Sequence, residues 1–367
     1  MERQSRDIDR DCAPDIRQKL RALEARGGRL TLPCGAYDIH DTVTVDDSGV
    51  CLAGETWACN VDPNGVFEPR HGTKLRMRGR DFAAVTVGRE HDPISGAEVC
   101  CLGIQGDIEG MDVRPYVDFA HPERMSGLCL DSVRTDQCDF RQLSFCGLAA
   151  AVCVTGQAEV DACLFEHLNA DGCGCGVWFA PRASYYARFR SCVVADNPYY
   201  GLYATSKGGH MHNLMVQDMI FVRNGGCFTD DDELPAAAVL FDRVNNCAVE
   251  RCLIDDPGTF WYYDKDATHN EQRQPSHRKT AALHVIGSGN RVRDNTILHA
   301  SAEAIIVEGD RNVLLGNIAD GDVVVSGRDN TVINQVFTSP DARLILKGEA
   351  AASTTVVGVP EDRIVRL

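Results

Sequence analysis

The 367-residue chain carries 53 acidic residues against 37 Lys and Arg, which gives a formal net charge of −16. So acidic a surface repels nucleic acid and polyanionic sugars unless a cation bridges them, and it favours a neutral ligand. The sequence has no run of about 18 apolar residues, so a membrane-spanning helix is excluded on length. We therefore expect neither a nucleic-acid nor a membrane partner.

The N-terminal segment 14–26 has the pattern of a short amphipathic helix. Ile16, Leu20 and Leu23 follow helical spacing, and Gly27-Gly28 ends the segment. Such a helix would cover the open end of a solenoid, where strand edges and core are otherwise exposed. The expected organisation is an N-terminal segment with a capping helix over 1–28, one continuous solenoid domain over 29–360, and a tail over 361–367.

Short β-branched strands recur along the rest of the chain. The V-x-G-x-x-N pattern occurs three times, with its glycines at Gly287, Gly309 and Gly327. A period of about two dozen residues means one supersecondary unit stacked on copies of itself. The pattern predicts an all-β, single-stranded parallel β-helix. Its predicted strand cores include 128–130, 152–154, 177–179, 202–204, 239–241, 296–298 and 344–346.

Four asparagines fall at similar places in successive coils: Asn246, Asn290, Asn312 and Asn330. Asn tolerates a left-handed backbone at a sharp turn, and its amide can bond to the Asn above and below. We predict that the four side chains form a stacked ladder along one corner of the solenoid.

The chain has 17 cysteines, an odd number, and it starts without an apolar signal segment. Many of these cysteines lie in or beside predicted strands, so reduced core thiols in a cytoplasmic protein are favoured over disulfides. Cys173-Gly174-Cys175 with His210 and His212 is the sharpest zinc candidate. A single C-x-C pair is a weak signal, and we expect no metal site there.

Two long insertions interrupt the coils, over 229–235 and 255–279. Both leave the same corner of consecutive coils, so they should lie side by side and wall a groove. The preceding coil adds the corner 196–200. Aromatic faces pack on sugar rings, and carboxylates bond to hydroxyls. The candidate substrate-binding residues are Asp196, Tyr199, Tyr200, Lys207, His210, Trp261, Tyr262, Tyr263, Lys265 and His277.

The same insertions supply candidate catalytic groups. Glycoside hydrolysis needs one protonated and one ionised carboxyl group, and crowded carboxylates raise one another's pKa. The candidates are Asp231, Asp232, Glu233, Asp255 and Asp256. A solvated acidic loop or a calcium site is the alternative, so calcium is the one cofactor considered. β-Elimination is the other chemistry, and its candidate bases or charge partners are Arg273, His277, Arg278, Lys279, Lys207 and His210.

The repeats, the capping helix and the entry sequence 27–37 (GGRLTLPCGAY) together resemble the pectate-lyase-like right-handed β-helix superfamily over nearly the whole chain. The resemblance implies a right-handed solenoid, often assembled as a homotrimer. It leaves the activity open, since the superfamily includes lyases, hydrolases, epimerases, fructotransferases and phage tailspikes. Residues 273–278 match the R-x-P-x-x-R pattern of pectate lyases, but the companion W-x-D-H motif is absent.

Segments 202–209 and 282–290 also look like coils of the inulin fructotransferases. An alignment with that family places Ala162 and Trp178 at its catalytic Asp and Glu, which implies that its activity is missing here. We predict an enzyme that cleaves or rearranges glycosidic bonds of an oligosaccharide. A lyase and a non-catalytic glycan-binding or structural β-helix are the alternatives.

Overall fold

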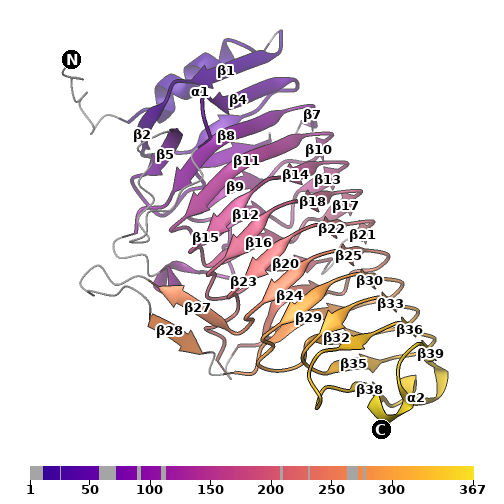
Figure 1. Cartoon of the computed structure of the whole chain (residues 1–367). Coiled ribbons are helices and arrows are strands. Elements are labelled where there is room, and N and C mark those ends of the chain that lie inside the picture. The colour runs from indigo at the N-terminus through magenta and orange to yellow at the C-terminus, as the bar shows by residue number, and fades with distance from the viewer. Residues whose placement is uncertain are drawn as a thin grey trace.

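The protein is a long solenoid whose first described coils and C-terminus lie at opposite ends (Figure 1). A computed structural model describes residues 11–24, 26–57, 72–88, 92–108, 113–206, 210–229, 232–262, 272–275 and 278–367, with only the backbone described for 260–262 and 272–275. Within these ranges, neither α-helix is long and apolar enough to cross a membrane.

Three parallel sheets run along the solenoid. The twelve-stranded sheet contains β3 (Val43–Val45), β6 (Val85–Val87), β9 (Ser126–Leu130), β12 (Ala150–Val154), β16 (Cys175–Phe179), β20 (Leu202–Thr205), β24 (Ala237–Asp242), β29 (Ala281–Ile286), β32 (Ile305–Glu308), β35 (Val323–Ser326), β38 (Leu344–Lys347) and β40 (Ile364–Arg366). The five-stranded sheet contains β7 (Ile94–Ser95), β10 (Thr135–Asp136), β13 (Glu159–Asp161), β17 (Ala183–Tyr185) and β21 (His210–His212).

The 21-stranded sheet consists of two ladders joined through the long strands β8 (Glu98–Gln105) and β11 (Asp139–Cys146). Its first ladder adds β1 (Gly28–Leu32), β4 (Val50–Gly54), β14 (Leu164–Glu166), β18 (Arg188–Arg190), β22 (Met215–Gln217), β25 (Ala248–Glu250), β30 (Arg291–Arg293), β33 (Val313–Leu315), β36 (Thr331–Ile333) and β39 (Thr355–Val357). Its second adds β2 (Gly35–Ile39), β5 (Thr73–Met77), β15 (Asn169–Asp171), β19 (Val193–Ala195), β23 (Ile220–Val222), β26 (Leu253–Asp255), β31 (Thr296–Leu298), β34 (Ile318–Ala319) and β37 (Val336–Phe337).

Each complete coil passes through the sheets in the same order. The chain runs from β12 through β13 and β14 to β15, and β16 then pairs in parallel with β12 one layer further on. Successive side chains of a strand point to opposite faces, so alternate residues enter the interior. The predicted strand cores are confirmed, and the architecture is a right-handed parallel β-helix.

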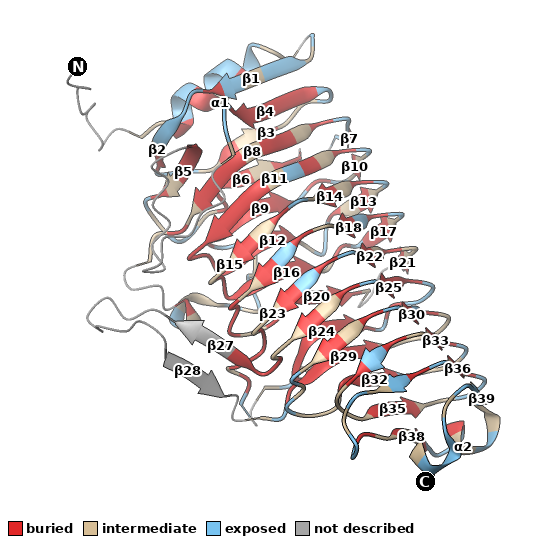
Figure 2. Cartoon of the chain, in the orientation of Figure 1, coloured by how far each residue is buried: buried red, intermediate tan, exposed pale blue. Residues whose placement is uncertain are grey.

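The interior is a continuous apolar column, and many residues of the strands that surround it are buried (Figure 2). Phe140, Phe165 and Phe189 occupy the same position in three consecutive coils. The rings of Phe165 and Phe189 stack with centroids 4.4 Å apart, and Phe140 lies 4.9 Å from Phe165. Because the strand register places equivalent positions of successive coils next to each other, each ring packs against the equivalent ring of the neighbouring coil.

The predicted asparagine ladder is confirmed for three of its four members. The side-chain oxygen of Asn312 accepts a hydrogen bond from the Asn290 N–H at 2.9 Å, and the Asn312 N–H donates to the Asn330 side chain at 2.8 Å. Asn246 is not a member, because it lies one residue too early. Cys247 occupies the ladder position instead, and its N–H donates to Asn290 at 3.0 Å.

Replacing Asn312 with Ala should lower the free energy of unfolding by about 1–3 kcal/mol, because buried partners lose their hydrogen bonds. The side chain is fully buried, and it also donates to the Gly287 carbonyl at 2.9 Å. Urea unfolding followed by circular dichroism measures the change. Asn245→Ala is the matched control, since the exposed Asn245 side chain makes a similar hydrogen bond to the Ser288 N–H; a loss as large as that of Asn312→Ala would contradict the prediction.

Helices cover both ends of the interior. The predicted N-terminal cap is α1 (Ala13–Arg21), which buries Ala13, Ile16 and Leu20 against the first coils. A second helix, α2 (Ala350–Ser353), buries Ala350 at the far end and was not predicted. The solenoid continues into the residues expected to form a tail, because β40 pairs in parallel with β38.

Twelve of the sixteen described cysteines are buried, and all sixteen are free thiols. The C-x-C pair does not present both sulfurs to one site. Cys173 belongs to the interior cluster, whereas Cys175 belongs to an apolar cluster on the outer face of the twelve-stranded sheet. Several residues of this outer cluster line the candidate site.

Candidate functional site

Aromatic side chains gather on the outer face of the twelve-stranded sheet. In β16, Val177 and Phe179 point into the interior and Trp178 points outward. Tyr203 of β20 is the register partner of Trp178, and the two ring centroids lie 4.4 Å apart. Alternation along two neighbouring strands therefore builds an aromatic floor, in which the two rings are tilted by 46° to each other.

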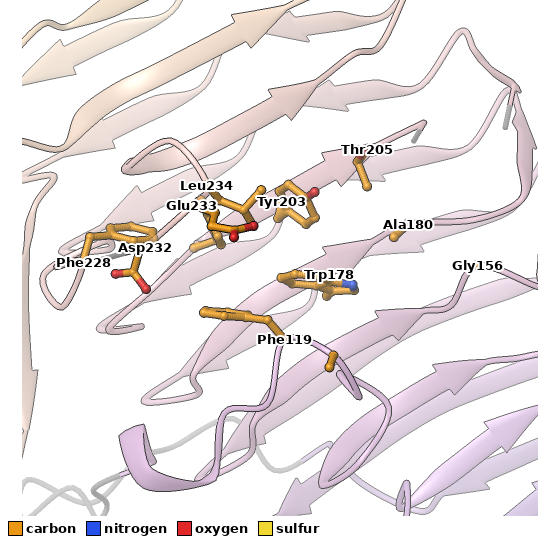
Figure 3. Close-up of a pocket in the computed structure, with 12 residues that line it drawn as sticks. Phe119, Gly156, Trp178, Ala180, Tyr203, Thr205, Phe228, Asp232, Glu233 and Leu234 are labelled. Carbon is orange, nitrogen blue, oxygen red and sulfur yellow. The ribbon is translucent and has the colours of Figure 1, made fainter. Parts of the chain in front are cut away.

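Two segments outside the coils form the sides of a pocket above this floor. The segment after the 3-10 helix η1 (Arg114–Tyr116) brings Phe119 over Trp178, with nearly parallel rings 5.5 Å apart. The segment between β23 and β24 brings Phe228 against Tyr200, with centroids 4.9 Å apart. Together they enclose a pocket of about 680 Å³ (Figure 3). Its lining residues are Phe119, Ala120, Gly156, Trp178, Ala180, Tyr200, Tyr203, Thr205, Phe228, Asp232, Glu233 and Leu234.

Two carboxylates stand at one rim of the pocket, Asp232 and Glu233. Asp232 fixes the turn of its own segment, since it accepts hydrogen bonds from the Thr229 N–H at 2.6 Å and the Thr229 hydroxyl at 3.2 Å. Glu233 is exposed, and among the described residues no hydrogen bond or ion pair engages its carboxylate. Glu233 is therefore the carboxylate at this rim that can meet a ligand without losing a protein partner.

On the other side of the floor, the hydroxyls of Tyr203 and Thr205 are hydrogen-bonded to the buried carboxylate of Asp242. Asp242, at the end of β24, accepts hydrogen bonds from the Thr205 hydroxyl at 3.2 Å and the Tyr203 hydroxyl at 3.4 Å. Burial raises the pKa of Tyr203 to about 12, so this hydroxyl keeps its proton at neutral pH. Asp242 was not among the predicted site residues, although strand alternation places it on the same outer face as Tyr203.

The two predicted insertions do lie side by side. The Arg278 guanidinium donates hydrogen bonds to the carbonyl oxygens of Asp232 and Leu234, at 2.8 and 3.1 Å. The Thr280 hydroxyl donates to the Gly225 carbonyl at 3.0 Å. Arg278 thus holds the segment that carries the rim carboxylates.

The predicted 196–200 corner contributes Tyr200 to the pocket lining, and Tyr199 supports the wall residue Phe119. Tyr200 is fully buried, and its hydroxyl donates to the Pro235 carbonyl at 2.9 Å. Tyr199 packs edge-on against Phe119 at 5.1 Å. Asp196 is turned away into a two-pronged ion pair with Arg223, with both contacts at 2.6 Å.

Asp255, Asp256 and His210 do not line the pocket. Asp255 pairs with Nδ1 of His299 at 2.8 Å and raises the pKa of that imidazole. Asp256 lies at the next residue, in the left-handed conformation of that corner. His210 begins β21 in the five-stranded sheet, and its ring lies 6.4 Å from that of His212. A catalytic or binding role for these three residues stays a prediction.

Several predicted site residues fall outside the described part of the chain. Trp261 and Arg273 face each other in the antiparallel pair β27 (Thr259–Tyr262) and β28 (Gln272–Pro275), which also contains Tyr262, but their side chains are not described. The remaining residues of this kind are Lys207, Asp231, Tyr263, Lys265 and His277.

The corner that carries Asp171 should make the stability of the protein depend on pH. Burial and the neighbouring Asp196 carboxylate raise the pKa of Asp171 to about 7, against the opposing charge of Arg223. The unfolded chain loses this proton near pH 3.9 (about the free value), so between about pH 4 and pH 7 the folded state holds an extra proton and stability falls as the pH rises.

Asp171→Asn should remove this decrease in stability with rising pH. At pH 8 the free energy of unfolding of the variant should exceed that of the parent by about 1–2 kcal/mol, less than the full pKa shift implies because partial exposure screens the charge. Urea unfolding at pH 5 and pH 8 tests it. The exposed Asp341 provides the control, as Asp341→Asn should leave the pH dependence unchanged. A parent that is equally stable at both pH values would refute the prediction.

No protein-family model and no curated protein matches this sequence. Solved structures do. DFA-IIIase from Arthrobacter chlorophenolicus A6 in complex with GF2 superposes with a TM-score of 0.68 at 15% identity, covering 100% of this chain and 94% of that one. The same protein without its lid gives 0.66 at 16% identity, covering 100% and 97%. Its complex with DFA-III gives 0.63 at 15% identity, covering 99% and 86%.

The chain is a right-handed parallel β-helix. This agrees with the resemblance drawn from the entry sequence and the repeats. At 15% identity the likeness extends to the fold alone. Of the two positions that the sequence alignment set against the fructotransferase carboxylates, Trp178 lies in the pocket floor, whereas Ala162 lies at a left-handed corner outside the pocket lining.

Proposed function

We propose that this protein is a carbohydrate-active enzyme that cleaves or rearranges a glycosidic bond of an oligosaccharide in the aromatic pocket. The observation that carries the proposal is the pairing of an aromatic floor, Trp178 and Tyr203, with two carboxylates at one rim. Sugar rings stack on aromatic faces, and carboxylates provide acid/base chemistry at the bond beside the stacked ring.

The size and composition of the pocket support a small, neutral ligand. A volume of about 680 Å³ lies within the range of about 300–1,000 Å³ that small-molecule sites occupy. Five of the twelve lining residues are aromatic, and Thr205, Asp232 and Glu233 supply polar side chains beside them. The formal charge of −16 disfavours a uronate polymer as the ligand.

Within this proposal Glu233 is the acid/base group. Its carboxylate is exposed at the rim and unengaged by the described protein groups, so it is available to protonate a leaving oxygen or to activate a hydroxyl or water. Asp232 is the second carboxylate of the rim and holds the turn that presents Glu233. Tyr203, whose proton is directed to Asp242, would accept a hydrogen bond from a sugar hydroxyl on its phenolic oxygen.

The structural neighbours guide the choice of test ligands. Structures of DFA-IIIase hold GF2 and DFA-III, so these two compounds head the panel. Calcium dependence, a homotrimer and a cytoplasmic location stay predictions of the sequence.

The deciding experiment incubates the protein with GF2, DFA-III and uronate-containing oligosaccharides. New reducing ends or a changed mass pattern, without ultraviolet absorbance of an unsaturated product, would support the proposal. Absorbance would move the chemistry to β-elimination, and binding without any product would make the protein a glycan-binding module.

Trp178→Ala should weaken binding of the turned-over oligosaccharide about tenfold or more, because the ring that stacks on the sugar is lost. Isothermal titration or KM measures the effect. Val324→Ala is a matched control, since Val324 also faces outward from the twelve-stranded sheet but lies several coils away in β35. Equal affinity in the parent and Trp178→Ala would remove this floor from the site.

A further inference from the structure

A second group of reactive side chains lies on the outer face of the 21-stranded sheet, near the N-terminal end. Cys51 of β4 is the register partner of Glu98 in β8, and Cys100 lies two residues further along β8. Their neighbours Leu52 and Val99 belong to the interior, so the pleat turns all three outward. One ligand atom from each of Cys51, Glu98 and Cys100 lies within 4.8 Å of the other two.

The three groups already interact with one another. The thiols of Cys51 and Cys100 both contact the Glu98 carboxylate, and they contact each other. A third thiol, Cys101, lies beside Cys100 and donates to the side-chain oxygen of Gln142 at 3.2 Å. Cys100 is 1% exposed and Cys51 is 7% exposed, so an ion among them would be shielded from bulk water.

Cationic side chains flank the cluster. Arg29 donates a hydrogen bond to the Cys100 sulfur at 3.4 Å, and Arg141 donates to the Glu98 carboxylate at 2.9 Å. A metal binds the thiolate form of cysteine, and the positive charges beside the cluster would offset part of the negative charge that the bound thiolates carry. Two thiolates and one carboxylate carry three negative charges, so a bound divalent ion would leave a net −1 that Arg29 offsets.

Other pairs of neighbouring thiols lack this combination of two thiols and one carboxylate. Cys129 and Cys153 are direct register partners on the twelve-stranded sheet, and Cys138 contacts Cys163 at a corner. Among the described residues, only Cys51, Glu98 and Cys100 form a group of three metal-ligating side chains at this spacing. A disulfide explains the arrangement less well, because the strand register pairs Cys51 with Glu98 and not with Cys100.

We propose that Cys51, Glu98 and Cys100 bind one thiophilic divalent metal ion, of which Zn²⁺ suits the donor set best. Zinc bonds of about 2.0–2.3 Å in a tetrahedral site place ligand atoms about 3.3–3.8 Å apart, so the side chains need to close by about 1.5 Å at most. The fourth position is taken by Cys101 or by water. On binding, each thiol ligand releases its proton to solvent and its sulfur forms a bond to the metal.

The test uses the full chain, reduced and freed of metal with a chelator, and titrates it with Zn²⁺ and with Co²⁺. The expected result is one ion per chain, with visible bands of a tetrahedral cobalt site and near-ultraviolet thiolate charge transfer. Two protons should be released per Zn²⁺ if water completes the site, and three if Cys101 does; Cys101→Ser distinguishes the two forms of the same proposal.

Cys51→Ser with Cys100→Ser should abolish the cobalt bands, and Glu98→Gln should weaken Zn²⁺ binding at least tenfold. Cys34→Ser is the control, because the exposed Cys34 thiol tests for adventitious binding and its loss should change nothing. Circular dichroism checks that each variant is folded, with Glu98→Gln as the variant that leaves the apolar packing intact.

Bands that persist in the Cys51/Cys100 double variant would overturn the proposal. It would also fail if reduced parent protein bound no Co²⁺, or if Cys51 and Cys100 were joined in a disulfide that forms in place of a metal complex. Oligosaccharide turnover is not a readout here, so failure of this site leaves the proposed function of the pocket untouched.

Discussion

Replacing Glu233 with Gln should lower kcat on the turned-over oligosaccharide by about 100- to 10,000-fold, the range that a positioned general acid or base contributes. The substitution keeps the size and hydrogen-bonding capacity of the side chain and removes only its ability to exchange a proton. KM should change little, because the aromatic floor of Trp178 and Tyr203 that binds the sugar remains. Initial rates of product formation, with the substrate found in the panel, measure both quantities.

Two variants sharpen the interpretation. Asp341→Asn removes an exposed carboxylate near the C-terminal end and should leave kcat unchanged. Asp232→Asn should disturb KM as well as kcat, since Asp232 accepts the hydrogen bonds that shape the Thr229 turn. If Glu233→Gln retained full turnover, the chemistry would have to rest on another carboxylate, and Asp242 behind Tyr203 and Thr205 would be the next to replace.

The architecture could be predicted from the sequence because every coil repeats the same local physics. Apolar alternation marks the strands, and residues in the left-handed region mark the corners, among them Ala162, Asp196 and Asn246. The offset of Asn246 shows the limit of this method. A ladder member must stand immediately before its strand, and in that coil Cys247 has this position while Asn246 forms the preceding turn.

Only those site residues that lie in insertions and corners could be predicted from the sequence. Asp232, Glu233 and Tyr200 were found because insertions and corners are visible in the sequence, and they do line the pocket. The strand pattern marks Trp178 and Tyr203 only as strand residues of the coils. Alternation alone could have placed both rings outward.

What alternation could not reveal is which segment covers those outward rings. Phe119 comes from a segment that lies 59 positions before Trp178, and nothing local links the two. Their contact depends on how the segment after η1 folds back over the sheet. Pocket walls of this kind are tertiary features, which the periodicity of the strands does not encode.

The interior stack supports the floor from behind. Phe179, next to Trp178 on β16, turns inward and meets Phe165 edge-on at 6.5 Å and Phe189 at 5.5 Å. The position of Trp178 therefore depends on how tightly these rings pack. Loss of the Phe165 ring should therefore disturb Trp178, because its neighbour Phe179 in β16 packs against that ring.

Phe165→Ala should lower the free energy of unfolding by about 3–5 kcal/mol, because it leaves a cavity between two rings that cannot close over it. Phe165 is fully buried and held between Phe140 and Phe189. Urea unfolding measures the loss, and Tyr186→Ala is the control, since Tyr186 is 51% exposed and should cost less than about 0.5 kcal/mol.

A loss below about 1 kcal/mol for Phe165→Ala would mean that neighbouring coils relax to fill the space. Stacked repeats are coupled mainly to their nearest neighbours, so the remaining solenoid should stay folded in the variant. The same variant should then show weaker oligosaccharide binding while Glu233 and Asp232 keep their places, since Phe179 and Trp178 share one strand. Intact binding in a strongly destabilised variant would instead show that Phe119 and Tyr203 fix the indole from outside.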